Sequence, residues 1–162
     1  MFLSDSFVVS SKTSEKIFIK DLMEGTNVLC FNDNDIISES VQNNIQPIRL
    51  KEHYRFIKRN NQNPNHLKLL NSYTIFKINN ILKSYTVDTI FVTKSGLKAI
   101  IPTMDSVTEL KQGDSIFYKN NWVQITNIEY SNHSLKDYLY NFQLNNQNNI
   151  FIVNGLLIYN KE

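Results

Sequence analysis

The chain of 162 residues contains little of several residue types that common functional sites require. Its single cysteine, Cys30, excludes an intramolecular disulfide and a cysteine-based zinc site. Its 17 basic and 15 acidic residues nearly balance, so we do not expect nucleic acid or an anionic membrane as a partner. No apolar run reaches the roughly 18 residues of a membrane span, and the N-terminus lacks a secretory signal pattern. We therefore expect an intracellular (cytoplasmic) protein without metal or cofactor that does not contact a membrane.

Alanine and glycine are also scarce. The sequence has one alanine, Ala99, and 4 glycines, against 23 asparagines and 19 isoleucines. Few alanines and many β-branched residues weaken helices and favour strands. Asparagine and isoleucine in place of alanine are also typical of AT-rich coding sequences, as in some phages, viruses and low-GC bacteria. This bias suggests a phage or virus particle as one place where the protein could be assembled.

Short runs of β-branched and aromatic residues recur along the whole chain, separated by polar turns about every 8–12 residues. They predict strands at 7–9, 17–19, 28–31, 73–76, 81–85, 89–93, 99–101, 115–118, 122–128, 138–144, 150–153 and 156–159. This pattern and the length predict one compact all-β domain over 1–162. Region 32–71, rich in asparagine, is expected to be a variable loop or insert, and within it a strand is favoured over a basic helix at Ile48–Arg59.

Two segments repeat the same short pattern. Ile19–Gly25 and Ser106–Gly113 each predict a single helical turn that ends at a glycine and leads into a strand. The two glycines stand 88 residues apart (113 − 25). The repeat indicates a duplicated, pseudo-twofold β-fold with very little helix.

The end of the chain, Phe151–Asn160, predicts a β-hairpin with its turn at Asn154-Gly155 and an asparagine as its last residue. This ending resembles the closing segment of the Hint (hedgehog/intein) superfamily. Further segments resemble that family in the same order along the chain: Met1–Val9, Lys16–Leu29, Thr86–Thr89, Val107–Phe117 and Tyr140–Leu144. The resemblance implies a compact horseshoe of short strands and an ancestral protein self-splicing or autoprocessing activity.

The family's chemistry needs residues that this chain mostly lacks. A cysteine or serine at the first position attacks the preceding carbonyl, and the histidine of a Thr-x-x-His motif protonates the leaving nitrogen. A terminal His-Asn pair then cleaves the chain when the asparagine cyclises. The vestigial positions are Met1 for the nucleophile, Thr89 for the motif histidine, Asn141 for a common aspartate and Tyr159 for the penultimate histidine. Thr86 and Asn160 remain as residual candidates, with Lys161 after Asn160 where a hydroxyl or thiol would accept the chain.

Other reactive side chains have structural interpretations. Cys30 lies in an apolar strand and is expected to be a core thiol. Ser6 fits a structural turn, and Trp122 is expected to be a core residue that anchors a hairpin. The three histidines, His53, His66 and His133, lack ligand spacing.

We therefore expect a catalytically inactive Hint domain, not an enzyme, that serves as a structural or interaction module. Its partners would be other protein subunits, such as those of a virion. The alternative is an autoprocessing domain with residual C-terminal self-cleavage at Asn160. A third hypothesis is an unrelated small β-barrel that binds peptides or nucleic acid.

Overall fold

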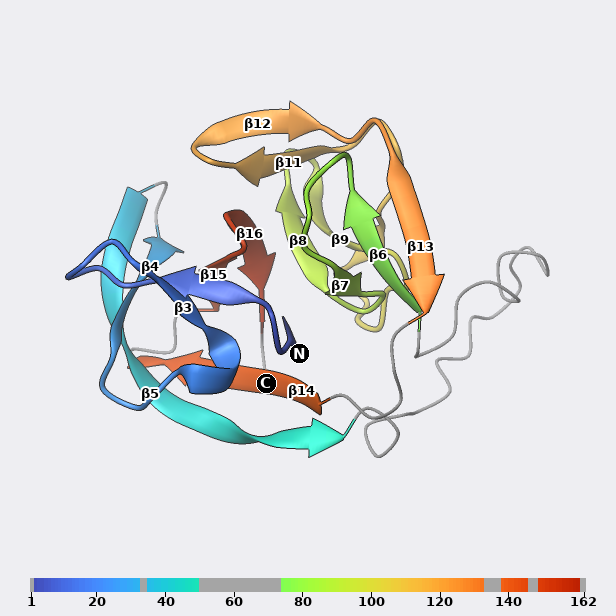
Figure 1. Cartoon of the computed structure of the whole chain (residues 1–162). Coiled ribbons are helices and arrows are strands. Elements are labelled where there is room, and N and C mark those ends of the chain that lie inside the picture. Colours follow the sequence, from blue (N-terminus) through green and yellow to red (C-terminus); the bar gives the residue numbers. More distant parts are fainter. Residues whose placement is uncertain (1, 33–34, 50–73, 133–137, 146–148, 161–162) are drawn as a thin grey trace.

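The computed structural model describes residues 2–32, 35–49, 74–132, 138–145 and 149–160 of the chain (Figure 1). It is an all-β structure, as the sequence predicts, and η1 is the one helix named within the described ranges. The elements are β1 (Phe2–Leu3), β2 (Phe7–Val9), β3 (Lys16–Phe18), η1 (Ile19–Asp21, a 3₁₀ helix), β4 (Asn27–Asn32), β5 (Asp35–Arg49), β6 (Thr74–Ile78), β7 (Tyr85–Thr86), β8 (Ile90–Thr93), β9 (Gly96–Ala99), β10 (Thr108–Glu109), β11 (Ser115–Tyr118), β12 (Asn121–Gln124), β13 (Ile128–Asn132), β14 (Tyr138–Leu144), β15 (Ile150–Val153) and β16 (Leu156–Tyr159).

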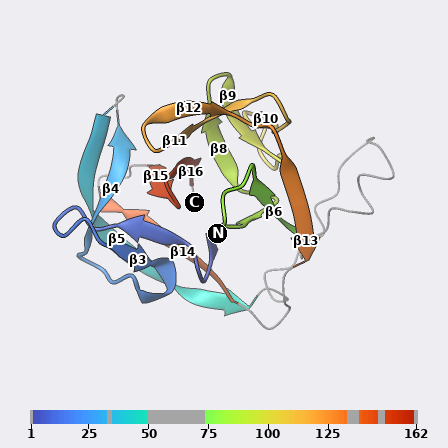
Figure 2. The same cartoon turned by 45° about the horizontal axis from the view of Figure 1, so that its top comes forward.

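An 11-stranded sheet forms most of the molecule. Its strands run in the order β1-β14-β5-β4-β15-β16-β11-β8-β9-β10, with β12 paired to β11. The sheet curls on itself, and the smaller sheets β13-β6-β7 and β2-β3 complete the curved wall (Figure 1). The rotated view shows the same ring of strands, with the N and C labels near each other at its middle (Figure 2). The largest fully buried side chains are Phe76, Phe91, Phe142, Ile19, Leu22, Ile78, Ile100, Ile116, Ile125, Leu144 and Leu156.

The internal duplication is visible in the backbone hydrogen bonds. In the first copy, the Gly25 N–H donates to the Val41 carbonyl at 2.7 Å, and the Val41 N–H donates to the Thr26 carbonyl at 2.8 Å. In the second copy, Gly113 and Asp114 make the same two bonds with Ile125, both at 2.8 Å. Both glycines have positive φ, +87° and +99°, a conformation that other residues rarely adopt. The repeated sequence pattern therefore corresponds to a repeated structure.

The two halves of the duplication, β1–β5 and β7–β13, also exchange a strand. β14 follows the second half in the chain but pairs with β1 and β5 of the first half. β6 follows the first half but pairs with β7 and β13 of the second. The groups β5-β14-β1 and β13-β6-β7 are therefore equivalent three-strand units. This exchange brings residues from both halves to the middle of the molecule.

The closing hairpin joins the two halves. β15 pairs with β4 of the first half, and β16 pairs with β8 and β11 of the second. Its turn has positive φ at both central residues, Asn154 at 55° and Gly155 at 82°, as the Asn-Gly dipeptide predicts for a type I′ hairpin. A methyl group on Gly155 would lie 3.0 Å from the Tyr118 ring, so this position also lacks room for a side chain.

Several sequence predictions differ from the structure. Of the strands predicted at 81–85 and 99–101, only Tyr85 and Ala99 belong to strands, at the start of β7 and the end of β9. Ser106–Gly113 forms no helical turn. It contains β10, which pairs with β9 in parallel. The Leu110 N–H binds the Ala99 carbonyl, a bond between segments that replaces one within a helical turn. Segment 122–128 is not one strand, since β12 ends at Gln124 before Ile125 bonds to Asp114. Trp122 anchors a hairpin but is 42% exposed, because its side chain lies on the outer face. The first part of region 32–71 forms the long strand β5, and residues 50–71 lie outside the described ranges.

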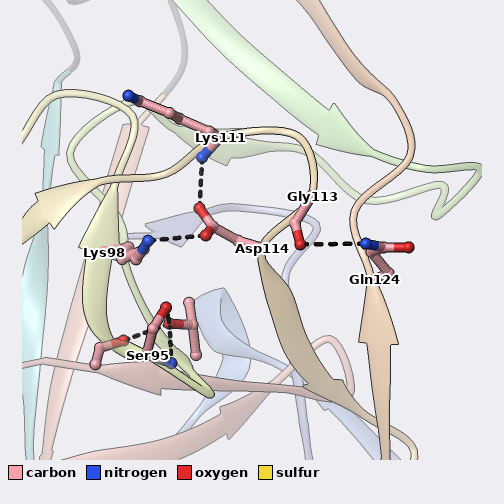
Figure 3. Close-up of polar contacts among 8 residues, drawn as sticks. Ser95, Lys98, Lys111, Gly113, Asp114 and Gln124 are labelled. Atoms are coloured by element: carbon pink, nitrogen blue, oxygen red, sulfur yellow. Dashed lines mark hydrogen bonds and ion pairs between the residues drawn. The ribbon is translucent and has the colours of Figure 1, made fainter.

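One carboxylate holds the corner between β9 and β11 (Figure 3). Asp114 accepts a hydrogen bond from the Lys98 ammonium at 2.8 Å and another from the Lys111 backbone N–H at 2.7 Å. The Lys98 and Asp114 side chains are only 16% and 15% exposed, so water screens this pair less than a surface pair.

We expect Asp114→Ala to lower the free energy of unfolding by about 1–2 kcal/mol, because the Lys98 ammonium and the Lys111 N–H both lose their acceptor. Urea denaturation checks this value. Lys111→Ala is the matched control and should change stability little, since only its backbone N–H takes part. Equal effects of the two substitutions would contradict this role of Asp114.

Candidate functional site

The sequence-predicted site residues come from four strands that meet beside β14. β16 pairs with β8 through Tyr159 and Ile90, and Asn160 and Thr89 are the next residues beyond this last pair. β1 pairs with β14 through Phe2 and Tyr140, next to Asn141. Strand exchange thus places both ends of the described chain close to β14 (Figure 1).

Asn160 is held by two other asparagines. Its side-chain amide nitrogen donates a short hydrogen bond to the carbonyl oxygen of the buried Asn141 side chain. Its backbone N–H donates to the Asn149 carbonyl at 2.8 Å. The structure therefore brings together Asn141 and Asn160, which the sequence selected separately, and fixes both the main chain and the side chain of Asn160.

A chain of hydroxyl groups lies at the end of β7. Thr86 donates from Oγ1 to the Asp88 carboxylate at 2.6 Å, and its oxygen lies 2.9 Å from Oγ1 of Thr89. Because the single hydroxyl proton of Thr86 points to Asp88, Thr89 must be the donor in the second bond. Both threonines are buried, at 7% and 5% exposure. Asp88 is the member of this group that sequence reasoning missed, although Thr86-Val-Asp-Thr89 is itself a polar motif.

Tyr159 has a packing role at the position of the family's penultimate histidine. Its partly buried ring packs against a small cluster of Ile90, Ala99 and Val107. Met1, Lys161 and the three histidines lie outside the described residues.

A second polar group links the closing turn to the start of the chain. Asn154 accepts a hydrogen bond from the Phe7 N–H at 2.9 Å through its side-chain oxygen, and its own N–H donates to the Phe7 carbonyl at 2.9 Å. Its amide nitrogen donates to the Ser6 hydroxyl at 3.4 Å. Ser6 and Asn154 are both buried, at 1% and 2% exposure. The sequence identified Ser6 and Asn154 as turn residues but gave no signal that they would meet.

Tyr85 adds an unsatisfied hydroxyl close to this polar group. Its ring packs between Phe76 and Phe91, with centroids 5.9 and 5.1 Å away, and the residue is 2% exposed. Its hydroxyl has no hydrogen bond of normal geometry within the described residues, although the Asn154 amide lies close enough to favour the phenolate slightly. Burial dominates and raises the pKa of the Tyr85 hydroxyl well above its ordinary value of 10.0.

Stability above pH 10 should therefore depend on Tyr85. The unfolded chain releases the Tyr85 proton near pH 10 while the folded protein retains it, so the folded state loses stability as pH rises through that point. Relative to Tyr85→Phe, the wild type should lose up to about 1.4 kcal/mol per pH unit above pH 10. Urea denaturation of both proteins between neutral pH and strongly alkaline pH measures this difference. If the free energies of unfolding of the wild type and Tyr85→Phe change in parallel with pH, the raised pKa of Tyr85 is contradicted.

Other candidate groups are structural. Cys30 is fully buried, as predicted, and its thiol lies 3.8 Å from the Ile37 carbonyl. Among the described residues, no three histidine, cysteine, aspartate or glutamate side chains gather in a way that could hold a metal ion. The described helical segment is also too short to cross a membrane.

Comparison with solved structures finds close counterparts of the whole chain. No protein-family model and no curated protein sequence matches it. A bacterial intein-like domain from Clostridium thermocellum superimposes with a TM-score of 0.65 at 14% identity, over 98% of this chain and 97% of that one. A DnaB intein from Synechocystis sp. PCC 6803 gives 0.63 at 12% identity, over 99% and 98%. The MchDnaB-1 intein gives 0.60 at 10% identity, over 99% and 100%.

These similarities extend over nearly the full length of each chain, while the sequence identities are low. They agree with the all-β architecture, the curled sheet and the closing hairpin described above. The protein therefore has the Hint (intein-like) fold.

Proposed function

We propose that this protein is a Hint-fold domain that no longer splices and that serves as a structural or protein-interaction module. The observation that supports this most directly is the set of side chains around Asn160. Thr89 directly precedes Ile90, the partner of Tyr159, while Asn141 holds the amide of Asn160 and Tyr159 precedes Asn160. None of these three side chains is an imidazole, the group that the family's chemistry uses at the positions of Thr89 and Tyr159. General acid catalysis of cleavage needs a group that can donate a proton near neutral pH, as an imidazole can.

The first step of splicing would fail for a separate reason. Met1 stands at the position of the nucleophile, and a thioether has no proton to lose and cannot become a thiolate. Cys30 is no substitute, because it is buried in the core within β4. Burial in apolar surroundings also disfavours the thiolate form.

The arrangement of the described ends suits a module within a larger assembly. Phe2 and Asn160 belong to segments that both contact β14, through Tyr140 and Asn141 respectively. A compact domain with neighbouring ends is readily inserted into or docked onto other proteins. We propose other protein subunits as partners, inside a cell or in an assembly such as a phage or virus particle. The amino-acid bias supports this location.

The loss of splicing can be tested at the N-terminal junction. A chain preceded by a short tag and incubated with dilute hydroxylamine at neutral pH should keep its tag, because under these conditions hydroxylamine attacks the ester or thioester that an acyl shift produces. Cleavage at Asn154-Gly155, which concentrated alkaline hydroxylamine causes, gives a fragment of a different mass and leaves the tag attached. The matched variant Met1→Cys has a thiol at this position, and comparing its tag release with that of the chain with Met1 shows whether the missing thiol is what prevents the acyl shift. Release of the tag from the chain with Met1 would contradict the proposal.

The second candidate function is slow cleavage after Asn160. The favourable observation is that Asn160 is already ordered by Asn141 and Asn149. In this reaction its amide nitrogen attacks its own main-chain carbonyl carbon. The bond to Lys161 breaks, and the proton leaves the amide nitrogen for the departing amine. A fragment that ends at Asn160, absent from Asn160→Ala, would establish this activity.

A further inference from the structure

The β11–β12 hairpin has an open edge on the outside of the molecule. β12 pairs with β11, and no other described strand pairs with it. Both views place β12 at the rim of the curled sheet, away from the chain ends (Figures 1 and 2). An open strand edge presents backbone N–H and C=O groups on which a further strand can add.

The geometry of the turn identifies the outward groups. Lys119 and Asn120 have φ values of 48° and 66°, which make a two-residue type I′ turn closed by Tyr118 and Asn121. The closing pair of such a hairpin is hydrogen-bonded, so alternation along β12 directs the backbone groups of Trp122 and Gln124 outward. The Gln124 carbonyl does bind outward, to the Asn79 amide at 3.2 Å. Within the described residues, no hydrogen bond is found for the backbone groups of Trp122, so they can accept a further strand.

An apolar strip leads away from this edge. Trp122 is 42% exposed and meets Phe117 at a ring distance of 5.3 Å, and Phe117 meets Phe31 at 5.6 Å. Phe31 lies opposite Ile36 in the β4–β5 pair, and Ile36 is 44% exposed. The strip thus joins residues of both halves on the outer face. Exposed apolar surface of this kind is typical of an interaction site.

The charge beside the open edge is positive. The Lys94 ammonium lies 5.8 Å from the centre of the Trp122 ring, and the Lys119 ammonium lies 5.2 Å from that of Tyr118. Neither has a carboxylate partner within the described part of the chain. The nearby carboxylate of Asp114 is already bound to Lys98, as Figure 3 shows. A segment that adds here would therefore gain from acidic side chains.

We propose that an extended acidic segment of a partner protein adds as a strand to the edge of β12, with apolar side chains against Trp122 and carboxylates near Lys94 and Lys119. This inference rests on the proposed role as an interaction module and gives the chemistry of the partner. The main-chain hydrogen bonds would supply the docking, while the alternating side chains would supply the selectivity.

Fluorescence anisotropy with short labelled peptides tests the proposal on the full chain. A peptide of alternating valine and glutamate should bind at least about tenfold more tightly than its valine–lysine counterpart. Trp122→Ala should weaken this binding at least about tenfold. Lys94→Glu should narrow or reverse the preference for glutamate. Phe18→Ala and Lys20→Glu are controls at an exposed ring and an exposed ammonium on another face, and they should leave binding unchanged.

The backbone part of the proposal needs its own probe. N-methylation of every second residue removes the hydrogen-bond donors on one edge of the peptide. One of the two methylation registers should abolish binding and the other should not, because only one edge of the peptide pairs with β12. Equal effects of the two registers, equal affinity for both peptide charges, or no effect of Trp122→Ala would overturn the proposal.

Two further outcomes also decide between explanations. Self-association that Trp122→Ala abolishes would assign the edge to a second copy of this chain and overturn an acidic partner. If the chain neither binds the peptides nor cleaves itself, the proposal of docking on β12 is overturned, while the proposed loss of splicing is retained. Self-cleavage after Asn160 would favour the second candidate function over a catalytically inactive domain, whatever the peptides do.

Discussion

Replacing Asn154 with alanine is expected to lower the free energy of unfolding by about 2–4 kcal/mol. The substitution removes the acceptor of the Phe7 N–H and the donor to Ser6, all in a region with little access to water. It also places alanine at a φ of 55°, where a Cβ atom costs about 1–2 kcal/mol. Urea denaturation with circular dichroism measures the change.

Two control variants separate these contributions. Asn154→Gly keeps the backbone conformation accessible and loses only the side-chain hydrogen bonds. Asn120→Ala tests positive φ alone, at 66° in an exposed turn, and should cost about 1–2 kcal/mol. A cost for Asn154→Ala no larger than that for Asn120→Ala would show that the link between the closing turn and the chain start does not stabilise the fold.

The second large effect is a gain of activity. In a chain extended beyond Glu162, Thr89→His together with Tyr159→His should raise the rate of cleavage after Asn160 by at least about 100-fold. The reason is that imidazole groups, with an ordinary pKa near 6.5, would then stand at position 159, next to Asn160, and at position 89, next to the partner of residue 159. Mass spectrometry of the intact protein follows the released fragment, and the rate should vary with pH between about 5 and 8.

The matched control for this gain is Asn160→Ala in the same double variant, which should release nothing. Circular dichroism confirms that the variant folds, because Tyr159 also packs against Ile90. A folded double variant without cleavage would show that the placement of Asn160, and not the missing imidazoles, prevents the reaction.

Local features of the sequence predict local features of this fold well. The two strands of the closing hairpin begin and end where the sequence places them, at Ile150–Val153 and Leu156–Tyr159. The reason is that an Asn-Gly turn and its flanking apolar runs specify a hairpin without help from the rest of the chain. The glycine-terminated repeat also corresponds to a repeated structure, because positive φ at Gly25 and Gly113 is a local requirement.

Two local features of the sequence predict different positions for Trp122. Its size and apolar ring favour the core, whereas its place in the side-chain alternation of the strand favours the outer face, and the structure follows the alternation. Trp122 was expected in the core because it is large and apolar. Its neighbours Ile116 and Ile125 are the buried residues of this region, at 1% exposure each, and Trp122 lies on the other face with Phe117. In the sequence, Trp122 and Gln124 alternate with the apolar Val123 and Ile125, a pattern that places Trp122 on the face opposite to Ile125.

The geometry of the site depends on contacts that no local pattern contains. Asn141 reaches Asn160 because β14 pairs with the first half of the chain, and this exchange follows from the tertiary fold. Asn154 reaches Phe7 across a sequence separation of 147 residues. Sequence reasoning could select Asn141 and Asn160 only through the family resemblance, and it left Asp88 and Tyr85 unnoticed.

The most direct test of the central claim is the intact mass of the native sequence with short extensions at both ends, followed for several days from mildly acidic to mildly alkaline pH. Loss of both splicing and cleavage predicts one unchanged mass at every pH and time. A fragment that ends at Asn160, or a joined product of the two extensions, would contradict it.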